Sequence, residues 1–327
     1  MKILITGGAG FIGSHLARFH LNRNDEVAVL DDLSTGKKEN IAPFLSSPHF
    51  RFKQADLCTY PRLEELVLGA ERIYHMAAIV GQKRVLKNSV DVLSSNIHGC
   101  ERILQIASKK NKDTRILIAS TSCVYDQLPP DPPKDEEATL LFPSGTYLQQ
   151  TYPLSKLVNE VMGLSYVGSQ NLHCVVSRLF NIIGPNQTGK YGMVVPTFIK
   201  QALTHNPITV YGDGQQTRSF CYIDDAVQAL YLLLENPSCK GEIINIGQDE
   251  EVSILSLAQQ IRQKTNSTSP IIHIPYKEAY GVDFQDIAKR RPILTKLQKL
   301  TRFHPKTCLD NALDQIIASS KENLSHL

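Results

Sequence analysis

Two side chains in the stretch YPLSK have the spacing and chemistry of an acid–base pair. Tyr152 and Lys156 lie four residues apart, so on a helix they share one face. A lysine ammonium beside a phenol favours the phenolate and lowers its pKa from about 10. Such a phenolate acts as a general base toward a hydroxyl group. Taken alone, the same spacing also fits an ordinary surface helix.

Hydroxyl and thiol groups gather in the stretch IASTSCVYD, just after a predicted strand. Ligands of open parallel sheets bind at the carboxyl ends of the strands, so this is a suitable place for chemistry. Either Thr121 or Ser122 is expected to bridge a substrate oxygen and Tyr152. Cys123 is either a weak acid, with an ordinary pKa of about 8.5, or a small apolar filler.

Three glycines in TGGAGFIG connect a predicted strand to a predicted helix. Gly7, Gly10 and Gly13 have the spacing G-x-x-G-x-x-G. The first allows the turn, the second lets the backbone approach a pyrophosphate, and the third lets the helix pack on the strand. The helix N-terminus then presents N–H groups to phosphates. Without further signals, the glycines also fit a tight turn that binds nothing.

An acid at the end of the second predicted strand favours a dinucleotide. Asp31 follows Gly13 by 18 residues, and a carboxylate there accepts hydrogen bonds from the ribose hydroxyls of NAD and repels the 2′-phosphate of NADP. Asp32 and Asp56 are either further ligands of the adenosine or solvated turn residues. The sequence has no Gly-Lys-Ser/Thr phosphate loop, which argues against ATP hydrolysis.

The elements that must position these residues alternate between strand and helix. The predicted strands of the first half are Lys2–Thr6, Glu26–Leu30, Phe50–Gln54, Arg72–His75 and Arg115–Ala119. The predicted helices between them are Gly13–Asn22, Leu63–Leu68 and Val92–Lys110. This alternation predicts a parallel sheet with helices on both faces.

The second half follows a proline-rich stretch, residues 127–145, which we expect to form a surface loop. The predicted helices that follow are Tyr152–Val167, Val194–Thr204, Asp224–Glu235, Ser253–Thr265 (with Ser253 as N-cap) and Leu309–Ser319. The predicted strands are Leu172–Leu179, Ile208–Tyr211, Glu242–Ile246 and Ile271–Ile274. No linker separates two halves of the chain.

Composition limits the classes of partner. The 327 residues carry a formal net charge of +3, with both signs spread along the chain. This pattern argues against nucleic acid and against an anionic membrane as partners. The seven cysteines show no metal-ligand spacing, so we expect reduced thiols, no metal and a cytoplasmic protein. We also expect no signal peptide and no membrane span.

Taken together, the motifs resemble the extended short-chain dehydrogenase/reductase family, in its nucleotide-sugar epimerase and dehydratase branch. The resemblance covers about residues 1–315 and is carried by TGGAGFIGSH, LDDLSTG, HMAA, STSCVY, YPLSK, SRLFNIIGP, VYGDGQQTRSFCYIDDA and KRRP. It implies a Rossmann-type doubly wound parallel sheet that binds NAD and a smaller α/β C-terminal domain for a nucleotide sugar. The first domain would span residues 1–180 with 220–250, and the second 181–219 with 251–327.

The resemblance also implies roles for single residues. Those expected at the cofactor are Gly7, Gly10, Phe11, Ile12 and Gly13 at the pyrophosphate, Asp31 and Asp32 at the ribose, Asp56 and Leu57 at the adenine, and Met76, Ala77, Ala78 and Asn96 along its length. Thr121 is expected to be catalytic, with Tyr152 as the base and Lys156 as its electrostatic partner and a ribose ligand. Those expected at the substrate are Gly81, Arg84, Thr121, Asn181, Val194, Arg218 and Arg291.

Several positions depart from the pattern of the family. Cys123 stands where dehydratases and decarboxylases carry Glu or Asp, and Ile293 follows Arg291-Pro292 where relatives carry an acid. The span from Tyr125 to Tyr152 is longer than in close epimerases. Basic residues in GQKRVLK fit either a uronate sugar or solvated helix charges.

From these features we predict a 4-epimerase that acts on a UDP-hexose through a transient 4-keto sugar. The nearest alternative is a dehydratase or decarboxylase that begins with the same oxidation at C4. A non-catalytic NAD-binding regulator is the alternative from another class. The resemblance further implies a homodimer, in which two helices of each chain, Val92–Lys110 and Tyr152–Val167, form a four-helix bundle.

Overall fold

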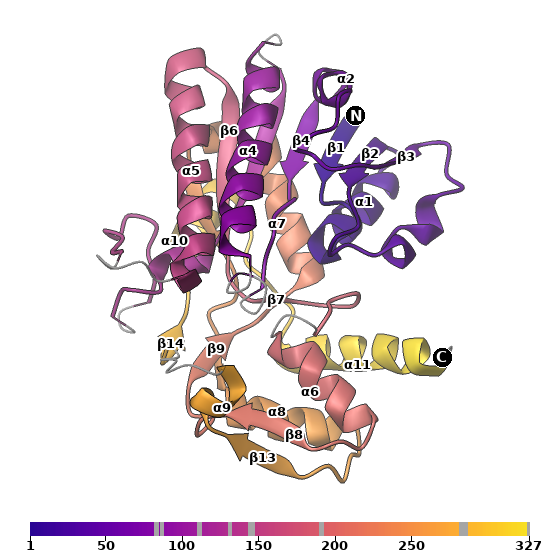
Figure 1. Cartoon of the computed structure of the whole chain (residues 1–327), viewed down its shortest axis with the longest axis vertical. Helices are drawn as coiled ribbons and strands as arrows, with labels where there is room; N and C mark the ends of the chain where they lie inside the picture. Colours follow the sequence, from indigo (N-terminus) through magenta and orange to yellow (C-terminus); the bar gives the residue numbers. More distant parts are fainter. Residues whose placement is uncertain are drawn as a thin grey trace.

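A seven-stranded parallel sheet forms the centre of the computed structural model, which describes residues 1–81, 85, 88–109, 113–129, 133–142, 148–189, 193–280 and 287–325. The order of its strands is β11-β6-β5-β4-β1-β2-β3 (Figure 1). Their bounds are β1 Lys2–Thr6, β2 Glu26–Asp31, β3 Phe50–Gln54, β4 Arg72–His75, β5 Arg115–Thr121, β6 His173–Leu179 and β11 Ile243–Ile246.

Helices cover both faces of this sheet. One hydrophobic core includes residues of α1 (Phe11–Leu21) and α7 (Ile223–Glu235). The other includes residues of α2 (Leu63–Gly69), α4 (Ser89–Ser108) and α5 (Thr151–Gln170), and α4 and α5 run side by side in Figure 1. The doubly wound Rossmann-type fold that the sequence predicts is therefore confirmed.

Strand order reverses between β1 and β4, and this reversal defines where a ligand binds. The chain runs outward from β1 to β3, then returns to β4 and runs outward on the other side. The connecting loops part at this point, which leaves a crevice at the carboxyl ends of the strands. Thr6, Asp31, His75 and Thr121 are the last residues of β1, β2, β4 and β5, so they surround this crevice.

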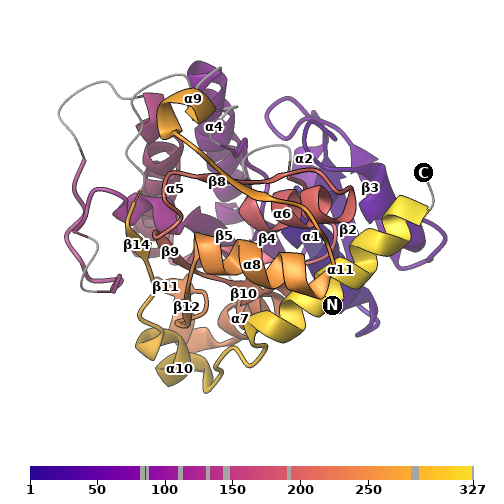
Figure 2. The ribbon, with the colours of Figure 1, turned by 90° about the horizontal axis from the view of Figure 1, so that it is seen from below.

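Most of the short strands and helices of the second half lie below the crevice (Figures 1 and 2). The strands are β7 Ile182–Ile183, β8 Ile208–Tyr211, β9 Thr217–Ser219, β10 Cys221–Tyr222, β12 Glu251–Ser253, β13 Ile271–Ile274 and β14 Lys289–Arg290. The helices are α6 Val194–Leu203, α8 Ile254–Lys264, α9 Tyr276–Tyr280, α10 Thr295–Thr301 and α11 Leu309–Ser325. Single 3-10 turns are η1 Lys38–Asn40, η2 Ala42–Phe44, η3 Ser122–Tyr125, η4 Leu148–Gln150 and η5 Pro237–Cys239.

The elements predicted from the sequence are all present, with ends that differ by a few residues. Ser253 caps α8 as predicted, because its hydroxyl accepts a hydrogen bond from the amide of Ser256. Five short strands (β7, β9, β10, β12 and β14) and two short helices (α9 and α10) have no counterpart in the predictions. β11 joins the large sheet beside β6, and α10 packs on α7 and β11. The predicted domain boundaries, which place α10 in the second domain, stay a prediction.

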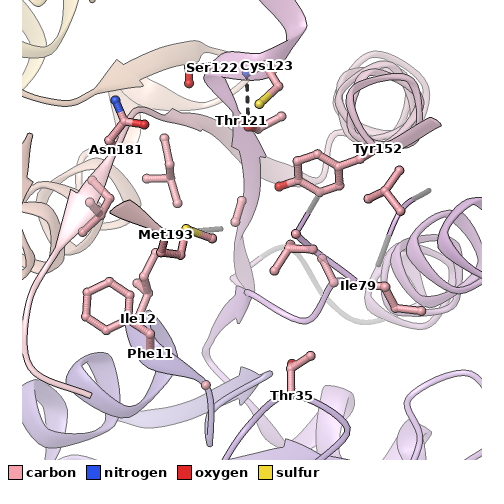
Figure 3. Close-up of a pocket in the computed structure, with 18 of the residues that line it drawn as sticks. Phe11, Ile12, Thr35, Ile79, Thr121, Ser122, Cys123, Tyr152, Asn181 and Met193 are labelled. Carbon is pink, nitrogen blue, oxygen red and sulfur yellow. Dashed lines mark hydrogen bonds between the residues drawn. The ribbon is translucent and has the colours of Figure 1, made fainter. Parts of the chain in front are cut away.

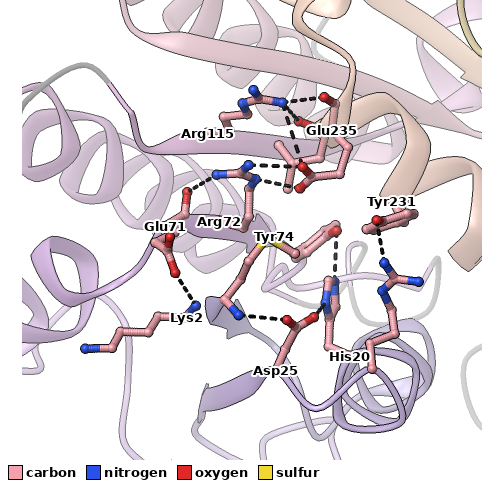
Figure 4. Close-up of polar contacts among 12 residues, drawn as sticks. Lys2, His20, Asp25, Glu71, Arg72, Tyr74, Arg115, Tyr231 and Glu235 are labelled. Atoms are coloured by element: carbon pink, nitrogen blue, oxygen red, sulfur yellow. Dashed lines mark hydrogen bonds and ion pairs between the residues drawn. The ribbon is translucent and has the colours of Figure 1, made fainter.

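Polar contacts close the opposite end of the sheet, where the strands begin (Figure 4). Arg72 holds Glu235 of α7 through two hydrogen bonds of 2.6 and 3.0 Å. The imidazole of His20 lies 2.7 Å from Asp25 and 3.0 Å from the hydroxyl of Tyr74. These contacts fix α1 and α7 against the sheet and leave its carboxyl ends for the crevice. Within the described ranges, none of the helices combines the length and apolar character needed to cross a membrane.

Candidate active site

One cavity of about 1360 Å³ lies at the carboxyl ends of the strands and continues between the large sheet and the second half. It brings together most of the residues that the sequence predicts for a site. The predicted residues that line it are Gly7, Gly10, Phe11, Ile12, Gly13, Asp31, Asp32, Asp56, Leu57, Met76, Ala77, Ala78, Gly81, Asn96, Thr121, Ser122, Cys123, Tyr152, Lys156, Asn181, Val194 and Arg218.

The glycine turn between β1 and α1 is packed so closely that side chains are excluded. Gly7 has φ +71°, and a Cβ at Gly13 would lie 2.3 Å from the carbonyl oxygen of Gly7. Gly8, which the sequence interpretation passed over, packs its Cα against Val29. At Gly10 a Cβ would meet only the Gly7 carbonyl oxygen, at 3.1 Å. Among the described residues no side chain caps α1, so its first N–H groups face the cavity. This cradle fits a pyrophosphate.

Three acids line the cavity near the glycine turn. The Asp31 carboxylate accepts hydrogen bonds from the amides of Ala9, at 3.0 Å, and Leu33, at 2.8 Å. Burial raises the pKa of Asp31, and these backbone bonds oppose that rise. Asp32 and Asp56 each accept a bond from the amide two residues ahead and are exposed. Asp31 is thus held rigidly beside the turn, where the ribose of a dinucleotide would be bound.

Asn96 lines the cavity, but its side chain is used within the protein. Its amide oxygen accepts a hydrogen bond from the amide of Ile79 at 2.7 Å, and its nitrogen donates to the hydroxyl of Ser155 at 3.0 Å. These bonds tie the loop after β4 to helix α5. Asn96 therefore supports the cavity wall and the helix that carries Tyr152 and Lys156.

The predicted acid–base residues meet inside the cavity. Figure 3 shows Tyr152 and Thr121 directed into the same space, with Phe11 and Ile12 across from them. Lys156 is 2% exposed, and its ammonium donates a hydrogen bond of 2.8 Å to the carbonyl oxygen of Ala119. Burial lowers the pKa of Lys156 to about 8. Since β5 and α5 supply these residues, their packing sets the geometry of the site.

The pKa of Tyr152 is raised in this structure, and the lowering that the sequence predicts from the charge of Lys156 stays a prediction. Burial raises the pKa of Tyr152, and a nearby Cys123 thiolate would raise it further. A hydrogen bond with Thr121 acts in the opposite direction. The sequence indicates that Tyr152 and Lys156 share a helix face, but it does not reveal that Tyr152 lies half-buried in the wall of a cavity.

Cys123 and Ser122 belong to η3, the turn that follows β5. The amide of Cys123 donates a hydrogen bond of 3.2 Å to the hydroxyl of Thr121 (Figure 3). Burial raises the pKa of the Cys123 thiol, which keeps it protonated near neutral pH. Ser122 is 3% exposed. Both residues line the cavity, but Cys123 provides a neutral thiol where the family pattern has an acid.

The second half contributes polar groups to the far end of the cavity. Asn181 donates a hydrogen bond of 3.0 Å to the carbonyl oxygen of Ser219. Arg218 is 9% exposed and donates to the carbonyl oxygens of Thr217 and Ile287, each at 2.7 Å. Val194, at the start of α6, also lines this end.

Arg290 lines the cavity, whereas the predicted Arg291 does not. Strand β14 pairs with β9 so that Arg290 lies opposite Arg218, and residues paired across strands share a face of the sheet. The next residue, Arg291, points the other way and lies 3.6 Å from a carboxylate oxygen of Glu251. The structure therefore places Arg290 in the cavity wall instead of the predicted Arg291, and a substrate role for an arginine of this segment stays a prediction. The predicted substrate residue Arg84 lies outside the described residues.

A buried ion pair anchors the strands and the helix behind the site. Arg178 of β6 lies 2.7 Å from Glu160 of α5, and the side chains are 4% and 1% exposed. Ser120 donates a hydrogen bond to Glu160, and Arg178 donates one of 2.8 Å to the Tyr125 hydroxyl. Since Glu160 is one helical turn after Lys156, this network fixes the register of α5 against β5 and η3.

Curated relatives match nearly the whole chain. A UDP-N-acetyl-alpha-D-glucosaminuronate decarboxylase from Bacillus cytotoxicus is 36% identical over 322 residues, which are 98% of each chain. A UDP-glucuronic acid decarboxylase from Arabidopsis thaliana is 31% identical over 324 residues, or 99% of this chain and 71% of that protein.

A solved structure and a family model agree with these matches. The UDP-glucuronic acid 4-epimerase from Bacillus cereus, in complex with UDP-glucuronic acid and NAD, is 28% identical, with a TM-score of 0.88 and coverage of 99% and 100% of the two chains. The model of the NAD dependent epimerase/dehydratase family matches residues 3–247. With the glycine cradle, Asp31, Thr121, Tyr152 and Lys156 in one cavity, the chain belongs to the NAD-dependent epimerase/dehydratase family and is an enzyme whose cofactor is NAD.

Proposed function

We propose that this enzyme oxidises C4 of a UDP-linked uronic acid and releases its C6 carboxylate as CO2. The observation that carries the proposal is the position of Thr121 and Tyr152 in one cavity with the glycine cradle and with Arg218 and Arg290. The decarboxylases at 31–36% identity support the choice of reaction and of UDP. The decarboxylase alternative considered from the sequence is thus favoured, and the UDP-hexose 4-epimerase stays a prediction.

Groups of the second half hold the nucleotide sugar in this proposal. The guanidinium groups of Arg218 and Arg290 bind the diphosphate, since their planar N–H groups suit phosphate oxygens. Asn181 supports this end of the substrate, and Val194 packs against the nucleobase. Gly81 also lines the cavity, and in this proposal its lack of a side chain gives room for the sugar ring.

Tyr152 acts on the C4 hydroxyl. Its phenol oxygen takes the hydroxyl proton, and Thr121 bridges Tyr152 and the sugar oxygen. Bound NAD+ supplies the hydride acceptance that the oxidation needs, and its positive ring favours the phenolate. The ammonium of Lys156 holds the ribose of the cofactor and adds positive charge. We also propose a set of cofactor contacts, with Lys156 at the ribose. The others are Asp31, Asp32, Asp56, Leu57, Met76, Ala77 and Ala78.

Oxidation at C4 makes the loss of CO2 chemically accessible. The C4 ketone lies β to the C6 carboxylate, so the electron pair of the C5–C6 bond passes into the ketone as CO2 leaves. No acid has to protonate the leaving group. A 4,6-dehydratase, by contrast, must protonate a departing hydroxyl, and Cys123 places a neutral thiol where the family pattern has that acid. The missing acid at position 123 therefore disfavours dehydration more than decarboxylation.

A second candidate function, 4-epimerisation of a UDP-uronic acid, has a specific observation in its favour. The Bacillus cereus structure at 28% identity is a UDP-glucuronic acid 4-epimerase that covers the same 99% of this chain. Epimerisation shares the first oxidation at C4, and the 4-keto sugar then turns before it is reduced from its other face. It needs no acid at position 123 either.

Product mass distinguishes the candidates. Purified protein is incubated separately with UDP-glucuronic acid, UDP-N-acetylglucosaminuronic acid, UDP-glucose and dTDP-glucose, and products are identified by mass spectrometry and NMR. We expect loss of CO2 from one of the two uronic acids and no reaction of the neutral sugars. An unchanged mass with inverted C4 identifies an epimerase, and loss of water identifies a dehydratase. Either result contradicts the proposed decarboxylation.

We also propose a homodimer in the cytoplasm. Helices α4 and α5 pack side by side, and they expose Val90, Leu154 and Val161 by 73%, 42% and 57%. Exposed apolar side chains on adjacent helices suit a four-helix bundle with a second copy. All seven cysteines are unpaired, which is compatible with a reducing compartment.

A further inference from the structure

Asp126 is an acid in the cavity that the proposed mechanism has not used. Among the described residues that line the cavity, four are acids. Three of them lie on the side of the glycine cradle: Asp31 ends β2, Asp32 comes next, and Asp56 follows β3. Asp126 comes directly after η3, the turn that follows β5. Among the described residues that line the cavity, it is the one acid on the side of Thr121 and Tyr152.

The geometry of η3 places Asp126 directly beside Cys123. The amide of Asp126 donates a hydrogen bond of 3.1 Å to the carbonyl oxygen of Cys123. Residues three apart in a 3-10 turn lie one above the other, so the carboxyl of Asp126 and the thiol of Cys123 stand on the same side of the turn. An acid is therefore present one turn beyond the position at which relatives carry it.

Buried contacts fix this turn. Tyr125, just before Asp126, is 1% exposed, and its hydroxyl donates a hydrogen bond of 2.9 Å to the side-chain oxygen of Asn245. Arg178 donates to the same hydroxyl at 2.8 Å. Asp126 thus extends from a turn that is anchored on one side to the buried network of β6 and β11, and on the other side it faces the cavity.

Charge and burial act in opposite directions on the Asp126 carboxyl. A guanidinium nitrogen of Arg290 lies 2.7 Å from a carboxylate oxygen of Asp126, and the side chains are 15% and 19% exposed. Burial raises the pKa of Asp126, while Arg290 and Arg218 act in the opposite direction. A diphosphate bound by these two arginines would weaken their hold on the Asp126 carboxylate and so favour its protonated form.

We propose that Asp126 is the proton donor to C5 of the sugar after CO2 has left, and this inference rests on the proposed decarboxylation. Loss of CO2 leaves the electron pair of the broken C5–C6 bond in an enolate across C4 and C5. The carboxyl of Asp126 gives its proton to C5, and the C4 ketone forms again. Return of the hydride and a proton from Tyr152 then restores the C4 hydroxyl. Water re-protonates Asp126, so one proton is consumed for each CO2 released.

Tyr152 and Cys123 are poorer candidates for this proton. Tyr152 is engaged at the C4 oxygen, which is a different atom of the sugar. The pKa of the Cys123 thiol is raised by burial, and a thiol with a raised pKa is a weak acid. Asp126 is the neighbouring group with a carboxyl, and its ion pair with Arg290 holds it in the wall of the cavity near the substrate.

The test separates the early steps from the late ones. Asp126→Asn enzyme and wild type are each incubated with the uronic acid substrate, and CO2 release, NADH absorbance and formation of the UDP-pentose are followed in single turnovers. We expect CO2 release within a few-fold of wild type, whereas UDP-pentose formation falls by about 10²-fold or more. NADH then accumulates together with the unprotonated enolate, which gives a 4-keto sugar once water has protonated C5. Asp126→Glu, which keeps the carboxyl, restores part of the UDP-pentose formation.

Two control variants identify a merely structural role. Glu137→Gln changes an exposed carboxylate, 85% exposed, in the segment that follows, and it should leave all three signals unchanged. Arg290→Gln removes the ion-pair partner and should raise KM. If Asp126→Asn only raised KM, as expected for Arg290→Gln, or if it lowered CO2 release and UDP-pentose formation equally, Asp126 would be a counter-ion. Either result would overturn the inference. Thermal unfolding and NAD content show whether each variant is folded.

The wild-type result separates this inference from the proposed function. A wild-type enzyme that released no CO2 from either uronic acid would overturn both. A wild type that released CO2, with Asp126→Asn and Asp126→Glu forming UDP-pentose at the same rate as wild type, would leave decarboxylation intact and overturn the role of Asp126 alone.

Discussion

At Tyr152 two effects on the phenol oppose each other. Burial raises its pKa, and a positive charge brought near by the cofactor lowers it. The phenol is therefore a poor base until the cofactor is bound beside it. This ordering suits an enzyme that should not remove protons from its substrate unless the hydride acceptor is present.

Removal of the Tyr152 hydroxyl should abolish turnover and leave the fold intact. In Tyr152→Phe the ring still fills the same position, but the proton of the C4 hydroxyl has no acceptor. We expect kcat to fall by about 10² to 10⁴-fold, with unchanged NAD content and thermal unfolding. Steady-state kinetics and the absorbance of bound cofactor measure these quantities. Tyr166→Phe, a change on the same helix outside the cavity lining, is the matched control and should retain wild-type kcat.

Local spacing predicts some site residues well and others poorly. Gly7, Gly13 and the Tyr152–Lys156 pair follow from a turn and a helix, whose geometry depends on neighbouring residues. The site position of Arg290 does not follow from local spacing. It depends on the pairing of β14 with β9, in which Arg290 lies opposite Arg218, a residue 72 positions earlier in the sequence. A two-residue strand such as β14 leaves no periodic pattern from which its inward face could be inferred.

At the scale of elements, β1 and β4 are joined by an unusual buried contact. The hydroxyl of Thr6 and Nδ1 of His75 lie 2.8 Å apart at the carboxyl ends of these strands. His75 is 1% exposed, and its Nε2 has no hydrogen-bond partner among the described residues. Burial, with a smaller effect of Lys156, lowers the pKa of His75 to about 3, so the imidazole is neutral in the folded protein.

Acid should therefore destabilise the fold through His75. Between pH 6.5 and the folded pKa of about 3, the unfolded chain binds the proton and the folded chain does not, so the free energy of unfolding falls as pH falls. From pH 6.5 to 4 the contribution is on the order of 3 kcal/mol. In His75→Gln the free energy of unfolding should fall less steeply over this range, as measured by urea unfolding. An equally steep fall would contradict the prediction. His49→Gln, at an exposed position, should match wild type.

The elements that sequence reasoning placed correctly are those with their own hydrophobic period. Strands β1, β2, β4, β5 and β6 bury runs of consecutive residues, and α7 buries a continuous apolar stripe, so their patterns are strong. Strands β9, β12 and β14 contain two or three residues each. These strands form through hydrogen bonds to neighbouring segments. For example, the amide of Thr217 donates a hydrogen bond of 2.8 Å to the carbonyl oxygen of Ala288. Such strands depend on the tertiary structure, so their sequences carry little signal.

At the scale of the whole molecule, the site depends on segments far apart in the sequence that are tied together. The amide of Lys134 donates to the carbonyl oxygen of Arg291, and the amide of Ile293 donates to the carbonyl oxygen of Lys134, each at 2.8 Å. Glu136 accepts a hydrogen bond of 2.8 Å from the amide of Asn245 in β11. The segment after η3 thus holds the segment that carries Arg290, so the acid Asp126 and its arginine partner are fixed by one set of contacts.

Assembly is the property of the whole molecule that a single surface change should alter. Val161 on α5 is 57% exposed and lies on the helix pair proposed as the dimer interface. A carboxylate in an apolar four-helix interface is costly to bury, so Val161→Asp should convert a dimer, of twice the 36.5 kDa of the chain, into a monomer. Light scattering coupled to size-exclusion chromatography measures the mass.

The position of the change decides how this result is interpreted. Leu45→Asp alters a side chain of similar exposure, 44%, that lies outside α4 and α5, and it should leave the mass of the assembly unchanged. NAD content should be equal in both variants, since the glycine cradle and Asp31 belong to a single chain. A monomeric wild type would contradict the proposed dimer, and dissociation by Leu45→Asp would place the interface on the other side of the sheet, near η2 and β3.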